Sequence, residues 1–172
     1  MPEEQRVIFH CDCNSFYASV ELLRYPELRG VPVAVCGSPD DRHGIVLAKN
    51  EPAKRYGVQT AETVWSALRK CPGLKLLPPH HGQYREMSRA VNAIYARYTD
   101  RIEPFGIDES WLDVTHTLHL FGGDAKALAD HLRQLPRRRG RRRPPGREGR
   151  DRPHHLGGRQ LQQGICQAGV GL

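Results

Sequence analysis

The chain has 172 residues, 38% of them hydrophobic, which suits one domain of ordinary size or two small lobes sharing a core. No stretch approaches the roughly 18 apolar residues that cross a bilayer, and the N-terminus lacks a basic signal-peptide start, so we expect a cytoplasmic protein without membrane contact. The net charge of +7 lies in the tail: residues 1–135 carry 16 Lys and Arg against 17 Asp and Glu, whereas residues 136–172 carry 10 Arg against 2 acidic residues. The overall basic charge therefore gives no support to a DNA-binding face on residues 1–135.

The first 76 residues alternate short strand and helix signals. A β-prone run ends at Asp12, and Asn14-Ser15 then offers an N-cap to an apolar helical stretch. Glycine and proline clusters separate the elements that follow. The expected strands are 7–11, 33–36 and 44–48, and the expected helices are 16–22, 51–56 and 63–70.

Residues 77–135 have longer elements. Apolar side chains at helical spacing predict an amphipathic helix over 84–98. The runs 102–107 and 110–114 predict a β-hairpin joined through Asp108-Glu109, and Asp124 caps a final helix. This order predicts an α+β fold: a mainly antiparallel sheet with helices on one face and a small α/β lobe inserted.

Three carboxylates stand at the ends of these expected strands. Asp12 ends the first strand, while Asp108 and Glu109 lie on the hairpin. If the two elements are sheet neighbours, the carboxylates converge and can bind Mg²⁺, which prefers oxygen ligands. Spacing alone leaves the alternatives open, because Asp-Glu pairs are common in solvated turns and Asp12 can simply cap a helix.

The segments around these carboxylates resemble three ordered motifs of the Y-family DNA polymerases of the UmuC/DinB type, with DNA polymerase IV as the nearest branch. Residues 12–21 read D-C-N-S-F-Y-A-S-V-E, residues 44–58 read G-I-V-L-A-K-N-E-P-A-K-R-Y-G-V, and residues 107–114 read I-D-E-S-W-L-D-V. The resemblance extends over about residues 6–135. It implies a palm over 1–23 and 77–135 with a fingers lobe inserted over 24–76.

The resemblance also implies an activity and its residues. The activity is template-directed transfer of a dNTP to a primer 3′-hydroxyl in translesion synthesis, within DNA damage tolerance, repair and replication. Implied partners are primer-template DNA, dNTP and, in a full-length form, a sliding clamp, with the protein a monomer. Two Mg²⁺ ions are implied, with ligands from Asp12, the Cys13 carbonyl, Asp108 and Glu109. Implied nucleotide contacts are Phe16, Tyr17 as the steric gate against a 2′-hydroxyl, and Lys54 as a cationic phosphate contact.

Two positions depart from the better-known members of that family: Glu51 and Lys54 replace a Tyr and an Arg that contact the triphosphate. Asn14 stands where many members have a second Asp, but other branches of the family also carry Asn there. Lysine lacks the planar fork of arginine, so the geometry at Lys54 differs from that of the family.

The tail, residues 136–172, has blocks of arginine and no apolar periodicity, so we expect it to be disordered or translated out of frame. Back-translating residues 158–172 and dropping one base gives G-V-S-F-N-K-A-F-A-K-L-G-S-D, which matches the next motif of the family. We therefore hypothesise a frameshift near residues 132–140. Two alternatives to an active polymerase remain: a catalytically inactive truncated fragment without thumb and little-finger domains, and a basic-tailed nucleic-acid-binding module.

The remaining candidates are interpreted as structural. The odd number of cysteines, with no C-x-x-C pair, indicates reduced thiols without a disulfide or zinc site, and Cys11 and Cys13 are expected to be buried. His80-His81 lacks partners at metal spacing, and Trp65 and Trp111 are interpreted as core residues.

Overall fold

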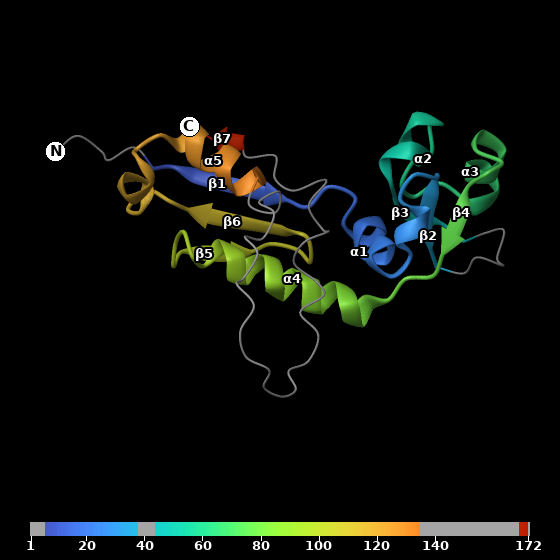
Figure 1. Ribbon diagram of the computed structural model, residues 1–172, viewed down its shortest axis with the longest axis horizontal. Coiled ribbons are helices and arrows are strands. Elements are labelled where there is room, and N and C mark those ends of the chain that lie inside the picture. The colour runs from blue at the N-terminus through green and yellow to red at the C-terminus, as the bar shows by residue number, and fades with distance from the viewer. Residues whose placement is uncertain (1–5, 38–43, 135–168, 172) are drawn as a thin grey trace, which may run out of the picture.

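The structure, a computed structural model, describes residues 6–37, 44–134 and 169–171, arranged as two lobes along the long axis of the molecule (Figure 1). The helices and 3₁₀ turns are α1 (Phe16–Arg24), η1 (Pro26–Leu28), α2 (Glu51–Arg55), α3 (Val64–Lys70), α4 (His81–Tyr95), η2 (Leu118–Phe121) and α5 (Ala125–Gln134). The strands are β1 (Ile8–Asp12), β2 (Val33–Cys36), β3 (Val46–Lys49), β4 (Lys75–Leu77), β5 (Ile102–Pro104), β6 (Glu109–Asp113) and β7 (Gly169–Gly171). All the expected helices and strands are present, with shifted ends.

The larger lobe is built on an antiparallel sheet with the strand order β5-β6-β1-β7. Side chains alternate across β1 and β6, so Phe9, Cys11 and Leu112 point into the core, whereas His10 and Trp111 lie on the more open face. Apolar side chains of α1, α4 and α5 pack in the same core cluster as the buried face. The predicted α+β fold, with helices on one face of an antiparallel sheet, is confirmed.

The smaller lobe has a second sheet with the order β3-β2-β4. β2 pairs antiparallel with β3 and parallel with β4, and all four residues of β2 are buried. Its core includes Ala34, Val46, Val58 and Leu74. Strand β4 was not expected, because three residues are too few to show a period of two.

Helix α1 lies between the two sheets and follows β1 after a sharp turn (Figure 1). Ser15 is the N-cap residue, as expected, but it has the left-handed backbone angles φ 54° and ψ 39° and its side chain forms no capping hydrogen bond. Its hydroxyl instead donates to Oδ1 of Asn14 at 3.4 Å. The turn that ends β1 thus determines the Ser15 conformation, at a cost of about 1–2 kcal/mol.

The tail differs in part from the sequence-based expectation. Residues 169–171 form β7, which pairs antiparallel with β1, Ile8 lying opposite Gly171. These three residues are therefore ordered in a strand and not disordered. The edge of β1 that does not pair with β6 presents backbone hydrogen-bonding groups, and β7 pairs with them. Residues 135–168 and 172 lie outside the described part of the chain.

The expectation that both tryptophans are core residues was wrong. Trp65 is 53% exposed and Trp111 is 39% exposed. Trp111 stacks on His10 with ring centroids 4.3 Å apart, and the Arg69 guanidinium lies 4.7 Å from the centroid of Trp65. Each ring therefore finds a planar partner at the surface instead of a place in the core. Within the described ranges, no helix has the length and apolar character needed to cross a membrane.

The expected burial of Cys11 and Cys13 is confirmed. Cys11, Cys13, Cys36 and Cys71 are all buried. Burial raises the pKa of the Cys36 thiol, which favours its neutral form.

Candidate active site

The two acidic motifs meet at one end of the larger sheet. Asp12, the last residue of β1, lies directly opposite Glu109, the first residue of β6. The backbone N–H of Cys13 donates to the carbonyl oxygen of Asp108 at 2.9 Å, which ties the end of β1 to the hairpin. The two elements are sheet neighbours, and their register brings the backbone positions of Asp12, Asp108 and Glu109 to the same end of the sheet.

Electrostatic interactions link the three carboxylates. Burial raises the pKa of Asp12 and the negative charge of Glu109 raises it further, while His10 and Lys54 act in the opposite direction. Burial also raises the pKa of Asp108, and both Asp12 and Glu109 add to this. Burial is the larger cause of both shifts, and the neighbouring carboxylates add a repulsion that a bound cation would relieve.

The donor set suits a hard divalent cation in its chemistry. Asp12, Asp108 and Glu109 offer carboxylate oxygens, the ligands that Mg²⁺ prefers. Among the described residues, no three or more His, Cys, Asp or Glu side chains are placed so that together they could hold a metal ion. The backbone register and the oxygen donors therefore fit Mg²⁺, whereas the side-chain rotamers would have to converge on it.

One histidine lies beside the carboxylates. His10 Nε2 is 3.3 Å from Glu109 Oε2, and the His10 ring stacks on Trp111. Both contacts of His10 lie on the open face of β1 and β6.

A cleft of about 320 Å³ separates the carboxylates from the smaller lobe. Its walls come from β1, the start of α1, β3 and α2. The lining residues are Asp12, Cys13, Asn14, Ser15, Phe16, Tyr17, Leu47, Ala48, Lys49, Lys54, Thr60 and Asp108. The structure thus brings all of the sequence-predicted site residues except Glu109 to this cleft, and Glu109 adjoins it opposite Asp12.

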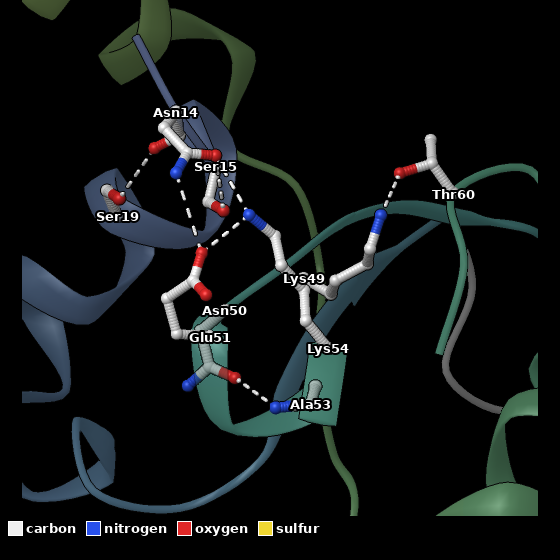
Figure 2. Close-up of polar contacts among 9 residues, drawn as sticks. All are labelled: Asn14, Ser15, Ser19, Lys49, Asn50, Glu51, Ala53, Lys54 and Thr60. Carbon is white, nitrogen blue, oxygen red and sulfur yellow. Dashed lines mark hydrogen bonds and ion pairs between the residues drawn. The ribbon is translucent and has the colours of Figure 1, made fainter. Parts of the chain in front are cut away.

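Cationic side chains come from the smaller lobe, as Figure 2 shows. Lys54 Nζ donates to Asn14 Oδ1 at 2.8 Å and to Glu51 Oε1 at 2.6 Å. Asn50 caps α2 by accepting from the Ala53 N–H at 3.1 Å, which fixes the start of the helix that carries Lys54. A cation therefore faces the acidic end of β1 across the cleft.

Lys49 is a second cleft cation, which sequence reasoning missed. Its Nζ donates to Thr60 Oγ1 at 2.8 Å. Burial and the charge of Lys54 lower the pKa of Lys49. The residues before Lys49 in β3 are apolar. Nothing in the local sequence therefore distinguishes Lys49 from a strand lysine that points into solvent.

Tyr17, the aromatic residue that lines the cleft, packs against a buried hydrogen-bonded group. Tyr17 stacks on Tyr84 with ring centroids 4.2 Å apart and an interplanar angle of 12°. The Tyr84 hydroxyl donates to the fully buried carboxylate of Glu21, which also accepts from the His80 backbone N–H at 3.1 Å. Phe16 beside it is 2% exposed, so its ring belongs to the core. Sequence reasoning missed the Glu21, His80 and Tyr84 group.

A match to a known family decides the classification. The family model described as the impB/mucB/samB family matches residues 11–140. The chain belongs to this family. A relative 56% identical over 134 residues is DNA polymerase IV of Acetivibrio thermocellus, and the match covers 78% of this chain and 33% of that protein. DNA polymerase IV 1 of Bacillus subtilis is 50% identical over 117 residues, covering 68% and 28% of the two chains.

Solved structures agree with that family. DinB from Sulfolobus solfataricus is 26% identical, with a TM-score of 0.67, and the likeness covers 75% of this chain and 38% of that one. A Y-family DNA polymerase chimera has the same fold, with a TM-score of 0.66 at 24% identity. The resemblance inferred from the motifs is thus confirmed. The chain spans about a third of the length of the relatives that it matches.

Proposed function

We propose that the chain is the palm and fingers part of a translesion DNA polymerase, with residues 1–23 and 77–135 as palm and 24–76 as fingers. The observation that carries the proposal is the direct pairing of Asp12 with Glu109 at the wall of a cleft that Lys54 faces. The two apolar clusters support the division, because one belongs to each sheet.

In this proposal the carboxylates of Asp12, Asp108 and Glu109, with the Cys13 carbonyl, hold two Mg²⁺ ions. When bound, such a pair supplies activation of a primer 3′-hydroxyl and neutralisation of triphosphate charge. Burial is the main cause of the raised pKa values of Asp12 and Asp108, and the part that comes from neighbouring carboxylates supports the assignment, since a cation would remove that repulsion.

The other cleft residues position the nucleotide. Lys54 balances phosphate charge, and the Tyr17 ring, fixed against Tyr84, contacts the sugar and excludes a 2′-hydroxyl. Phe16, with its ring in the core, contacts the nucleotide through its backbone. The primer hydroxyl then attacks the α-phosphate of the dNTP and pyrophosphate leaves. Catalysis of this kind depends mostly on positioning and charge stabilisation, which these residues supply from two lobes.

A second candidate is a fragment that binds nucleotide without catalysis. It is favoured by the tail, in which residues 158–172 match a family motif only after a one-base shift. The triphosphate lysine of that motif is absent from the tail as written.

Primer extension with dNTPs and Mg²⁺ separates the two candidates. The 172-residue chain is compared with the product continued in the alternative frame of the same coding DNA, and each is also tested as Asp12→Asn and Asp108→Asn. We expect extension by the continued product, lost in both variants, and little by the 172-residue chain. Robust template-directed synthesis by the 172-residue chain would exclude the inactive fragment. No synthesis by either chain would refute the polymerase proposal.

A further inference from the structure

The two departures from the better-known relatives, Glu51 and Lys54, form one contact cluster with Asn14. Lys54 Nζ lies 2.6 Å from Glu51 Oε1 and 2.8 Å from Asn14 Oδ1, and Asn14 Nδ2 lies 3.5 Å from the same Glu51 oxygen. Figure 2 shows the three side chains converging from α2 and from the turn between β1 and α1. The cluster bridges the two lobes where Asn14 and Lys54 line the cleft.

The two partners of Lys54 differ in what they can do. An ammonium has three N–H donors, of which Asn14 and Glu51 take two. Asn14 is neutral and fixed to the end of β1. The hydrogen bond from Lys54 lowers the pKa of Glu51 against the opposing effect of burial, which favours the ionised carboxylate. A carboxylate on this amine resembles a phosphate oxygen in charge and in hydrogen bonding.

Glu51 can leave Lys54 without disturbing the fold. Its side chain is 58% exposed, compared with 31% for Lys54, and the two residues are three apart on one helix. Ion pairs of this exposed kind hold weakly, since water solvates either partner when it is released.

We propose that Glu51 is an internal competitor for phosphate at Lys54. Its carboxylate occupies the amine while the cleft holds no nucleotide and turns to solvent when a triphosphate binds, whereas Asn14 keeps Lys54 directed at the cleft in both states. This inference rests on the proposed role of Lys54 as a phosphate contact. It adds Glu51 as the residue that sets how tightly Lys54 binds a triphosphate.

The consequence is weaker triphosphate binding than Lys54 alone would give. Two unit charges about 5 Å apart in water-like surroundings alter a binding constant roughly fourfold. Glu51→Gln should therefore lower the Kd for a triphosphate about three- to tenfold at low salt. The difference should shrink above about 0.3 M salt, because screening then acts over a few ångströms.

Isothermal titration of the 172-residue chain in EDTA tests this with inorganic tripolyphosphate and with dGTP. Omitting divalent ions separates the Lys54 site from the carboxylates. Lys54→Ala should weaken binding of both probes, and Asn14→Ala should weaken it less. The matched control is Asp130→Asn, which removes the same charge from another exposed helical ion pair, Lys126 Nζ to Asp130 Oδ2 at 2.7 Å, on α5 away from the cleft lining.

The outcomes separate this inference from the function on which it rests. Tighter binding in Glu51→Gln than in Asp130→Asn, lost at high salt, supports the competitor. Equal affinities in these two variants, or weaker binding in Glu51→Gln, overturn it while leaving Lys54 as a phosphate contact if Lys54→Ala binds less. If Lys54→Ala leaves the affinities for tripolyphosphate and dGTP unchanged, both the inference and the proposed phosphate contact are refuted.

Discussion

Removing one hydroxyl from the wall behind the cleft should destabilise the whole protein. In Tyr84→Phe the ring and its stack on Tyr17 remain, but Glu21 loses the hydrogen bond that the Tyr84 hydroxyl donates. Both side chains are fully buried, so water cannot replace the donor. Burial and the Glu21 carboxylate both raise the pKa of Tyr84, so the phenol stays protonated and donates at neutral pH.

The expected loss follows from the charge of the acceptor. A hydrogen bond to a charged group contributes about 1.5–3 kcal/mol. Glu21 keeps the His80 backbone N–H and the contacts of its carboxylate oxygens with His80 Nδ1, at 3.1 and 3.0 Å, so the loss should be about 2 kcal/mol. For a chain of this length that lowers the Tm by about 4–8 °C.

Urea unfolding followed by circular dichroism measures this loss. Tyr56→Phe is the matched control, because the Tyr56 side chain is 56% exposed, and it should change the free energy of unfolding by less than about 0.5 kcal/mol. A double-mutant cycle with Glu21→Gln should give a coupling of at least about 1 kcal/mol. Equal stabilities of Tyr84→Phe and Tyr56→Phe would refute the role of the buried hydrogen bond.

Three further predictions concern the gate, acid stability and the tail. Tyr17→Ala in an active form should raise ribonucleotide incorporation without changing Mg²⁺ dependence, and unchanged sugar selectivity in competition assays would remove the gate assignment. Burial alone would raise the pKa of Asp113, but hydrogen bonds from Thr115 and Arg6 outweigh it and lower the pKa to about 2. Because this pKa is lowered in the folded state, its contribution is complete above about pH 4 and is lost as the pH falls towards 2. Asp113→Asn should therefore cost about 1 kcal/mol at pH 7, after allowance for screening at exposed Arg6, and nothing near pH 2 in acid-unfolding curves. Sequencing the coding DNA should reveal a one-base shift upstream of residues 158–172, and an intact reading frame continuing the tail would contradict the hypothesis.

Local patterns in the sequence determined the elements and the acidic motifs. A β-prone apolar run marked β1 and a strand-like run marked β6. Helical spacing marked α4, and Asp12 and Asp108-Glu109 stood at strand ends, where sheet pairing could bring them together. These signals are readable because each depends on neighbours within a few residues.

The tertiary structure alone decided which distant side chains meet. Lys54 reaches Asn14 across 40 positions, and Tyr84 reaches Glu21 across 63. No local period encodes such pairs, because they depend on how two lobes pack around α1 and on rotamers chosen within that packing. The same reason explains why Glu51 looked like an isolated departure in the sequence and is a partner of Lys54 in the fold.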